Sequence, residues 1–449
     1  MVSLPLLLVY VSDTVIHVTD TAFLGRVGTV ELAALALVYI LFETSLVPVI
    51  GLVEAMQIVV ARRVGERRGN LVAATFLHGM LLILAVSIAL AVVLHGSASV
   101  LGDVLAEDPD VAAAVAGFLH IAAYGVVPAS LTLGYGALYV GLARTAVLVG
   151  ATTLLAGTNL LVSYALTLGE LGQPRLGIAG AAWAFVAAEW AAFVFLTVCT
   201  VVKWWPRGNP GRRRVAEEGP ALRRLLTLPP RLTLRPLLQL APPVAMRGLL
   251  EGLQWLAFFW IIEQVSAEAL AQANIIYACF AVLLIPSYAV GKSTTSLVSN
   301  VIGQGHTDEV RTVTRRAARA AYLMTVPLAT LALLTPHTVI AIFTDDRMIT
   351  AATAPSLQLL AVAMMLVVPA EVSLAAVTGT GATDVAFGID LVLAVAMVAG
   401  TYATAIILKW PLALVWASVG LAALVALAMS RWWLTTKRVK PLDRIPDAG

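Results

Sequence analysis

The sequence predicts an all-α integral membrane protein with twelve transmembrane helices, arranged as two parallel six-helix repeats. Sixty per cent of the 449 residues are hydrophobic and only 12% are charged, and the mean hydropathy is +0.91. A soluble domain of this length cannot hide that much apolar surface, so the bilayer must act as the solvent. Two further observations lead to the same prediction: twelve apolar segments long enough to cross a bilayer, and an internal repeat.

The twelve apolar segments follow one another along the whole chain. A hydrocarbon core about 30 Å thick needs roughly 20 apolar residues in a helix. The predicted spans are 4–24, 31–58, 71–95, 111–142, 146–168, 177–202, 240–262, 269–298, 320–343, 351–379, 384–408 and 412–434. Several are longer than one crossing requires, which predicts tilted or kinked helices.

The basic residues gather on one side of these spans. Alternate loops, the segment 203–236 and the C-terminal tail together hold 23 of the 29 Lys and Arg residues, whereas the opposite loops hold four. Cytoplasmic loops of membrane proteins are enriched in Lys and Arg. We therefore expect a multi-pass protein of the cell membrane, plasma or inner, with both termini in the cytoplasm.

The two halves of the chain resemble each other, and residues 31–65 align without gaps with residues 269–303. The constant distance in sequence between aligned positions is called the repeat offset. The same offset pairs Asp108 with Asp346. Shared hydrophobicity would align leucine and valine, but not proline, glycine and tyrosine. Each repeat holds six spans, an even number, so both insert in the same orientation, as in transporters with parallel repeats. The aligned identities include Leu32/Leu270, Tyr39/Tyr277, Phe42/Phe280, Pro48/Pro286 and Gly65/Gly303.

The chain divides into two lobes and a linker. The N-lobe covers 1–202 with the first six spans, and the C-lobe covers 237–449 with the last six spans and a short cytoplasmic tail. Between them, 203–236 contains nine basic residues against two glutamates, together with several prolines. This composition predicts a cytoplasmic linker near lipid headgroups. Nucleic-acid binding is the other interpretation of a basic run, but inside-facing loops are basic in any case, so we expect no nucleic-acid partner.

Eight acidic side chains lie inside predicted spans, not counting Glu31 and Asp384 at the first position of a span. A charge at bilayer depth costs about 2.5–3.5 kcal/mol on insertion scales. Such groups therefore persist where they face a wet cavity, bind a cation or carry a proton, and ion or proton coupling is their natural role. The eight are Asp13, Asp20, Glu43, Glu54, Glu189, Glu251, Glu371 and Asp390.

The first span carries a polar stripe. Asp13, His17 and Asp20 are spaced i, i+4, i+7, so a helix presents all three on one face. Asp20 is the first candidate for ion or proton coupling, and Asp13 is the second. His17 either relays a proton between the two carboxylates or only hydrogen-bonds one of them to hold the helix in its bundle.

The second half has candidates of its own. Glu251 and Glu371, on spans 7 and 10, could bind a cation with nearby oxygens, which suits Na⁺ as well as H⁺. A simple interhelical hydrogen bond is the alternative for each. Glu54 and Lys292 occupy equivalent repeat positions near the cytoplasmic ends of spans 2 and 8. They either pair as an inter-lobe gate or extend separately toward the interface.

The sequence lacks the motifs of an enzyme. No Gly-x-Ser-x-Gly, His-Glu-x-x-His or paired Cys-x-x-Cys motif occurs, and the glycine-rich stretch 378–384 has no Lys-Ser/Thr after it. The largest predicted non-membrane stretch is the linker, which is too short for a catalytic domain. We therefore expect a protein that is not an enzyme and that uses no cofactor beyond a coupling ion, H⁺ or Na⁺.

Three stretches resemble the multidrug and toxic compound extrusion (MATE) family. They are "DTAFLGRVGTVELAAL", "EAMQIVVARRVGERRGN" and "LIPSYAVGKSTTSLVSNVIGQG". The likeness extends to the six-plus-six spans, the basic central segment and "GTGATD" after span 10. The resemblance is to prokaryotic members, with the DinF-like branch as one candidate subgroup.

The resemblance implies an antiporter whose two lobes rock around a central cavity. Such a protein exports organic, often cationic or amphiphilic compounds while H⁺ or Na⁺ runs inward. In prokaryotic members the aspartate of the first motif is a coupling site, which matches Asp20. Other members use acids on spans 7 and 10, which match Glu251 and Glu371. If Na⁺ is the metal ion that binds, these are the positions implied for it.

One position departs from the family pattern. Members of this kind carry an Asn and, four residues later, an Asp on span 5, whereas "TNLLVSYAL" supplies Asn159 and Ser163. The missing carboxylate favours H⁺ over Na⁺ at Asp20. Thr21, Asn159, Ser163 and water could still complete a weaker Na⁺ site.

The expected partners are a small organic substrate and membrane lipids, and we infer no obligate protein partner. The alternative function is a flippase for a lipid-linked precursor, from the related superfamily. Such a protein needs a cationic cavity for a diphosphate. Only Arg247 and Lys292 are basic residues deep within spans, with Arg431 near the end of the last span counted in the tail, against eight acids, so the sequence favours multidrug efflux.

Overall fold

The computed structural model describes residues 3–204, 229–344 and 346–436. Its elements are helical, and no strand occurs among these residues. The chain forms two compact units, Met1–Ala245 and Met246–Gly449, and their boundary falls inside helix α10 (Pro230–Glu263). Most of the predicted linker at 203–236 lies outside the described residues, so the prediction for it stays a prediction.

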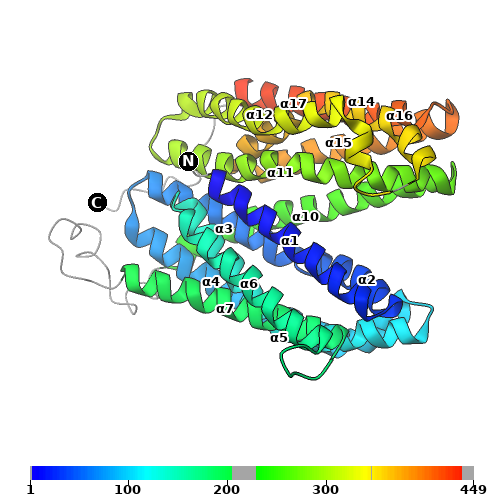
Figure 1. Cartoon of the computed structure of the whole chain (residues 1–449). Helices are drawn as coiled ribbons and strands as arrows, with labels where there is room; N and C mark the ends of the chain where they lie inside the picture. The colour runs from blue at the N-terminus through cyan, green and yellow to red at the C-terminus, as the bar shows by residue number, and fades with distance from the viewer. Residues whose placement is uncertain (1–2, 205–228, 345, 437–449) are drawn as a thin grey trace, which may run out of the picture. The chain divides into compact units, whose positions relative to one another are not determined.

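The first unit is built around helix α5. Its helices are α1 (Ser3–Val27), α2 (Thr29–Ser45), α3 (Val47–Gly65), α4 (Gly69–Leu105), α5 (Pro109–Gly141), α6 (Ala146–Leu168) and α7 (Ile178–Trp204), followed by the first part of α10. Helix α5 packs against α2, α3, α4 and α7. Helix α1, dark blue in Figure 1, packs against α2 and α6. The predicted polar stripe of the first span is therefore carried by a helix with these two neighbours.

The second unit is built in the same way around helix α14. Its elements after α10 are α11 (Ala267–Gly303), η1 (Thr307–Glu309), α12 (Val310–Leu334), α13 (Pro336–Ile340), α14 (Arg347–Gly379), α15 (Thr383–Tyr402), the π-helical η2 (Ala403–Ile407), α16 (Leu412–Val415) and α17 (Ala417–Thr436). Helix α14 packs against α11, α12, α15 and α17. One hydrophobic core, including the fully buried Phe258 and Trp416, joins these helices.

The helix ends confirm the repeat that the sequence predicts. Helix α5 ends at Gly141 and α14 ends at Gly379, and the repeat offset relates these two positions. Their first residues, Pro109 and Arg347, are related by the same offset. Equivalent central helices of equal length therefore occur in both units.

The same N-terminal cap begins both central helices. The side chain of Asp108 accepts a hydrogen bond from the backbone N–H of Asp110 at 2.8 Å. The side chain of Asp346 accepts from the N–H groups of Met348 at 2.7 Å and Ile349 at 3.3 Å. An aspartate at this position satisfies donors that a helix leaves without internal partners. The sequence pairing of these two aspartates thus has a structural cause.

A proline shared by the repeats has different effects in the two units. Helices α2 and α3 are separate and bent by 47°, with Pro48 in the first turn of α3. Its counterpart Pro286 lies inside α11, which is assigned as a single helix from Ala267 to Gly303. Proline has no N–H and clashes with the preceding turn, so a bend or break is expected near it. Only the first unit interrupts the helix at this proline.

Each predicted span has a helix in the structure. Among the described residues, ten helices are long and apolar enough to cross a membrane, and the bent pair α2–α3 makes an eleventh span. The remaining predicted span, 240–262, lies within α10. Helix α10 is long enough but carries Arg247, Glu251 and Gln254 near the middle of that segment, which lowers its hydropathy. It also begins at Pro230, earlier than the apolar pattern predicts.

Candidate functional site

A buried aspartate on α1 forms the first candidate site. Asp20 is only 6% exposed. The hydroxyl of Tyr39, on α2, donates a hydrogen bond to Oδ2 of Asp20 at 3.0 Å. The other oxygen, Oδ1, is buried and has no hydrogen-bond partner among the described residues. A buried carboxylate that is only partly satisfied suits a group that binds a proton or a cation.

His17 and Glu43 lie around the tyrosine that holds Asp20. The ring of His17 packs edge-on against the ring of Tyr39, with centroids 4.4 Å apart. Glu43, one turn after Tyr39 on α2, is within electrostatic range of both rings. His17 and Glu43 are exposed, whereas Tyr39 is half-buried. Polar groups thus lead from the surface of the unit to the carboxylate, and both predicted roles of His17 stay predictions.

Helix α6 supplies the other polar side chains predicted for this site. Asn159 and Ser163 are buried there, and Thr167 continues the same face one turn further on. The hydroxyls of Ser163 and Thr167 lie 3.1 Å apart. The side-chain oxygen of Asn159 is buried and, among the described residues, accepts no hydrogen bond. Because α6 packs against α1, these groups and Asp20 belong to neighbouring helices.

Helices α1 and α6 therefore each contribute a buried acceptor oxygen that accepts no hydrogen bond among the described residues, Oδ1 of Asp20 and Oδ1 of Asn159. Leaving such a group unpaired costs about 1–3 kcal/mol. Another acceptor cannot relieve this cost, but a proton on the carboxylate or a small cation bound by the oxygens can. The group therefore has the chemistry expected of a cation-binding site, and its role in ion coupling stays a prediction.

Two predicted members are not placed in the buried group. Thr21 is exposed on α1, and its hydroxyl donates to the backbone carbonyl of His17 at 2.8 Å. Asp13 lies on the same helix, about two turns before Asp20, but its side chain is outside the described part of the molecule. Their roles in ion coupling stay predictions.

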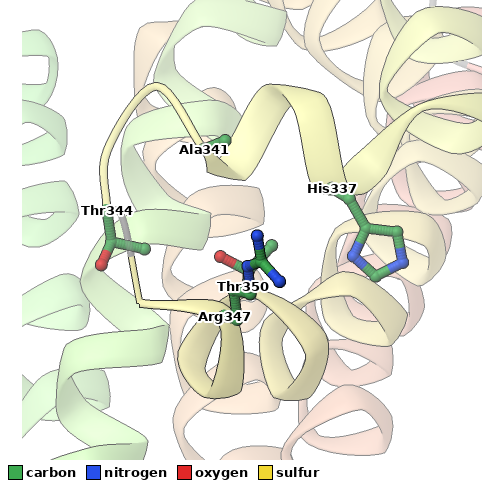
Figure 2. A pocket seen from close by; sticks show the side chains of 5 residues that line it. All are labelled: His337, Ala341, Thr344, Arg347 and Thr350. Carbon is green, nitrogen blue, oxygen red and sulfur yellow. The ribbon is translucent and has the colours of Figure 1, made fainter.

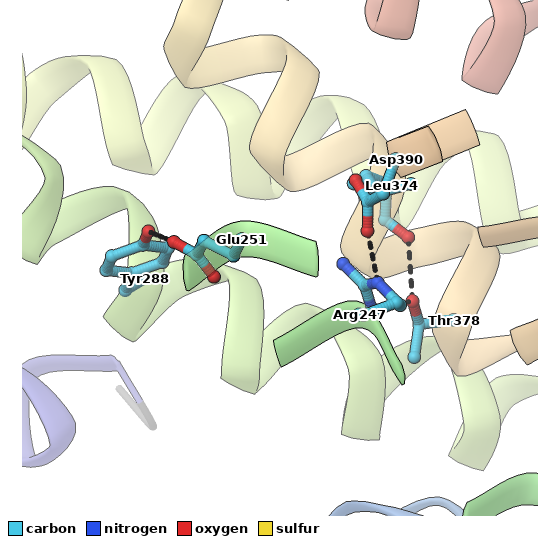
Figure 3. Close-up of polar contacts among 6 residues, drawn as sticks. All are labelled: Arg247, Glu251, Tyr288, Leu374, Thr378 and Asp390. Atoms are coloured by element: carbon cyan, nitrogen blue, oxygen red, sulfur yellow. Dashed lines mark hydrogen bonds and ion pairs between the residues drawn. The ribbon is translucent and has the colours of Figure 1, made fainter. Parts of the chain in front are cut away.

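The second unit holds a separate acidic group, part of which is drawn in Figure 3. Glu251 on α10 accepts a hydrogen bond from the hydroxyl of Tyr288 on α11 at 2.8 Å. Glu371 on α14 is within electrostatic range of Glu251. The two acids predicted for the second half therefore belong to one electrostatic cluster.

An arginine of the same cluster is paired with an aspartate. The guanidinium of Arg247 on α10 forms an ion pair with Asp390 on α15, and both side chains are about one-fifth exposed. Its Nη1 donates a hydrogen bond to Oγ1 of Thr378 on α14 at 3.0 Å. The Thr378 hydroxyl in turn donates to the carbonyl of Leu374 at 3.1 Å. Arg247 thus connects three helices of the second unit.

The two acidic groups share one position of the repeat, since the repeat offset relates Asp13 to Glu251, but the position of Asp20 is not shared. The repeat offset places the counterpart of Asp20 at Phe258, a core residue that is 0% exposed. Tyr39 corresponds to Tyr277, whereas the tyrosine that binds Glu251 lies about three turns further along its helix. Apart from Asp13 and Glu251, the two units therefore place their polar groups at different positions of the shared fold.

The sequence did not single out the partners of these acids. Tyr39 carried one signal, because it is identical to its counterpart in the second repeat. Thr167 lies four residues after Ser163, which places it on the same helical face. Arg247 and Asp390 are far apart in the sequence. The signal there was only that both are charged residues within predicted spans.

The predicted gate involves residues of both units. Glu54 lies on α3 in the first unit and Lys292 lies on α11 in the second. Both side chains are half-buried. The ion pair between them stays a prediction.

The residues that could hold a metal ion are oxygen donors. Among the described residues, no three His, Cys, Asp or Glu side chains cluster as they do around a metal. An ion such as Na⁺ also takes amide and hydroxyl oxygens. The candidates are Asp20, Asn159 and Ser163 in the first unit, and Glu251 and Glu371 in the second.

A cavity in the second unit is separate from both groups. Its volume is about 450 Å³ and it lies between α13 and the start of α14, as shown in Figure 2. It is lined by His337, Ala341, Thr344, Arg347 and Thr350. None of the acids described above lines it, so it adds nothing to the candidate sites.

Comparison with known proteins agrees with the repeat. A family model described as MatE matches residues 5–165 and 243–403. The starts of the two matched segments are related by the repeat offset, and so are their ends. Each of the two matches therefore covers one repeat.

The chain also resembles named bacterial proteins. It is 23% identical over 347 residues to "Probable multidrug resistance protein NorM" of Pasteurella multocida (strain Pm70), covering 77% of this chain and 72% of that one. It is 23% identical over 311 residues to "Multidrug resistance protein MdtK" of Proteus mirabilis (strain HI4320), covering 69% of this chain. The alignment spans 65% of the Proteus protein, slightly less than two thirds of its length.

A solved structure has the same fold. The structure described as "Crystal structure of MATE in the straight conformation" matches with a TM-score of 0.86 over 96% of this chain and 94% of that chain. The sequences are 18% identical. At this identity the likeness concerns the fold alone.

Proposed function

Because this chain belongs to the MatE family, we propose that it is a secondary antiporter that exports organic compounds in exchange for H⁺ or Na⁺. Its named relatives are multidrug resistance proteins, which supports multidrug efflux as the activity. The compounds are cationic or amphiphilic, because acids clearly outnumber bases within the predicted spans. The protein resides in the inner or plasma membrane, and the distribution of Lys and Arg supports cytoplasmic termini.

The observation that carries this proposal is the environment of Asp20. Its carboxylate is buried, one oxygen is held by Tyr39, and the other has no donor among the described residues. A carboxylate at bilayer depth is too costly to keep without a role, and this one is arranged to gain a cation. Coupling of transport to that cation is the role that fits the fold.

Cation binding at Asp20 drives transport by changing the balance between inward-open and outward-open states. A ligand shifts such an equilibrium only through a difference in its affinity for the two states. An ionised Asp20 and a protonated Asp20 differ by one charge at bilayer depth, and this difference is large enough to favour different arrangements of the lobes. Substrate and ion compete for the same negative region, so release of one accompanies binding of the other.

We favour H⁺ over Na⁺ as the coupling ion at Asp20. The hydroxyl of Ser163 stands where a second carboxylate would strengthen a Na⁺ site, and it already lies against the hydroxyl of Thr167. A proton needs one carboxylate oxygen, whereas a metal cation needs several oxygen ligands at once. The first unit supplies one acid and several neutral oxygens, which suits a proton better.

A flippase for a lipid-linked diphosphate has less support. Such a function needs unpaired basic side chains in the spans. Of the two bases found there, Arg247 is paired with Asp390. The charge pattern therefore favours cationic or amphiphilic substrates over a diphosphate.

The proposal is tested with purified protein in liposomes. Efflux of a fluorescent lipophilic cation is followed under an imposed pH gradient and, separately, under an imposed Na⁺ gradient. Coupled efflux in either case supports antiport, and the gradient that drives it identifies the ion. If neither gradient drives efflux while the protein is folded and correctly inserted, the proposed function is wrong.

A further inference from the structure

Four exposed arginines form a patch of positive charge on the second unit. Three lie in the first half of α12 and one lies near the end of α17. The arginine of α17 is within electrostatic range of Tyr322 on α12, so it lies near that helix. None of the four forms an ion pair with another described residue. The members of this arginine patch are Arg315, Arg316, Arg319 and Arg431, and each is exposed.

Helix α12 begins beside the end of α17. The side chain of Arg311 donates hydrogen bonds to the carbonyl of Leu434 at 3.5 Å and to that of Thr435 at 2.7 Å. Arg315 lies one turn after Arg311, and Arg431 lies one turn before Thr435. The two helices therefore carry their patch arginines near the same end of the unit, at about the same level.

The arginines of α12 repel one another. Arg315 and Arg319 are one turn apart, and like charges at this spacing destabilise a helix. Neither α12 nor α17 contains an acidic residue. The nearest acids along the chain, Asp308 and Glu309, precede α12, and Glu309 lies 3.9 Å from His306. An anion bound at the patch would relieve this repulsion.

The repeat shows that the shared fold does not require these arginines. Helix α4 begins at Gly69, and the repeat offset relates this residue to Thr307, where η1 begins. The preference of cytoplasmic loops for Lys and Arg explains basic residues on this side of the membrane. It does not explain why only one repeat gathers them on these two helices. The first-unit counterparts of the patch are Leu77, His78, Leu81 and Phe193, none of which is an arginine or a lysine.

Exposed apolar side chains continue the surface of α12 beyond the patch. Leu323 lies one turn after Arg319 on the same face, and Leu331 and Leu334 follow toward the end of the helix. On α17, the exposed Trp432 is next to the patch. Tryptophan is enriched at the boundary between membrane and water. The patch therefore lies where lipid headgroups meet the apolar part of the bilayer.

We propose that the arginine patch binds the phosphate of an anionic phospholipid in the cytoplasmic leaflet, with the acyl chains along the exposed leucines of α12. Arginine donates parallel hydrogen bonds to phosphate, and basic clusters beside transmembrane helices bind acidic headgroups. The leaflet follows from the proposed orientation of the termini, and the inference is independent of antiport.

The charge of the chain does not favour one of its own segments as the ligand. Among the residues outside the described ranges, 205–228 contain six basic residues and two glutamates. Residues 437–449 contain four basic residues and two aspartates. Both segments are basic overall, so the arginines would repel them. A lipid supplies the negative charge and also matches the apolar surface beside it.

The test compares two lipids in mixed micelles. Purified protein in a non-ionic detergent receives phosphatidylglycerol or phosphatidylcholine with the same acyl chains, and its melting temperature is measured at fixed ionic strength. We expect phosphatidylglycerol to raise the melting temperature by about 5 °C more than phosphatidylcholine does. In the variant Arg315→Gln/Arg316→Gln/Arg319→Gln, this difference should fall below about 1 °C.

Two controls separate the patch from total charge and the lipid from a free anion. Arg67→Gln/Arg144→Gln/Arg235→Gln removes the same charge from three separate exposed positions of the first unit, and it should keep the difference between the lipids. Inorganic phosphate without lipid should give the same melting temperature as chloride at equal ionic strength.

Four results would overturn the proposal. Equal melting temperatures of the wild type in the two lipids would show that the headgroup charge is not recognised. A full difference in the patch variant, or an equal loss in the control variant, would show that the patch is not the site. Stabilisation by inorganic phosphate alone, as large as that by the lipid, would assign the patch to a soluble anion.

Single variants keep the test decisive if the triple variant does not fold. Arg316→Gln and Arg319→Gln each remove one exposed charge, and each should reduce the difference between the lipids by about one third. No reduction in either variant would contradict the proposal. The measurement detects lipid binding and requires no transport, so its outcome is distinguishable from that of the efflux assay in liposomes.

Discussion

At the scale of single residues, the candidate site of the first unit is defined by the groups that surround the carboxylate of Asp20 on α1. Tyr39 supplies one hydrogen bond to Asp20, and the second oxygen of the carboxylate has no donor among the described residues. A hydrogen bond to a charged group contributes about 1.5–3 kcal/mol, which offsets part of the cost of a buried charge but not all of it. The ionised form is therefore held in place but remains ready to accept a cation.

Asp20→Asn should abolish coupled efflux without unfolding the protein. The amide keeps an oxygen that can accept from Tyr39, so we expect stability to change by less than about 1 kcal/mol. It cannot take up a proton, so efflux under a pH gradient should fall by about 100-fold or to background. Efflux in liposomes and the melting temperature check the two parts of the prediction. Asp103→Asn, at an exposed position of α4, is the matched control and should leave efflux unchanged.

The sequence could predict the acids of the candidate sites but not their partners. Asp20 and Glu251 are visible from sequence because a carboxylate within an apolar span is costly and therefore rare. A tyrosine in a span is common, so Tyr39 and Tyr288 carry little signal of their own. Which side chains contact these acids is decided by which helices pack together, and a single sequence does not reveal this packing.

At the scale of helices, the repeat appears as matching ends, caps and close contacts. The caps follow from local chemistry, because an aspartate before a proline or arginine at the helix start can reach the first free N–H groups. The break at Pro48 does not follow in the same way. Pro286 has the same place in the repeat and lies inside a continuous helix, so packing around each proline decides between the two outcomes.

Removal of the caps should destabilise the central helices. Asp108→Ala and Asp346→Ala remove acceptors of backbone N–H groups, and each should lower the free energy of unfolding by about 0.5–2 kcal/mol. The larger loss is expected for Asp346, which accepts from two N–H groups where Asp108 accepts from one. Melting temperatures of the purified variants measure the effect. Asparagine at either position still caps a helix, so Asp→Asn variants should stay close to wild type.

The last residue of α14 must be a glycine for α14 to approach α11. A Cβ added at Gly379 would lie 2.5 Å from the carbonyl oxygen of Thr295, which is backbone and cannot move aside easily. Gly379→Ala should therefore cost about 1–3 kcal/mol of stability. Gly388, on α15, has open space around its Cβ position. Gly388→Ala should be neutral or stabilising by about 1 kcal/mol, and equal melting temperatures for the two variants would show that the close contact is absent.

At the scale of the whole molecule, one repeated fold carries two different polar groups. The repeat offset recovers the central helices and their caps, but it places hydrophobic Phe258 where the first unit has Asp20. The scaffold could therefore be predicted from the sequence twice over, once for each repeat. Symmetry could predict only part of the functional groups, because it relates Asp13 to Glu251 but gives Asp20 no acidic counterpart.

The two units should contribute separately to ion coupling, and neutralising variants can measure each share. The double variant Glu251→Gln/Glu371→Gln neutralises the two candidate coupling acids of the second unit, and it keeps Asp20. We expect efflux under a pH gradient to fall by about tenfold rather than to background. Combined with Asp20→Asn, it should remove all dependence of efflux on the gradient. Effects of groups without shared partners multiply in rate, because their free energies add. A double variant with wild-type efflux would assign coupling to the first unit alone, since the acids of the second unit would then bind no ion that moves with the substrate.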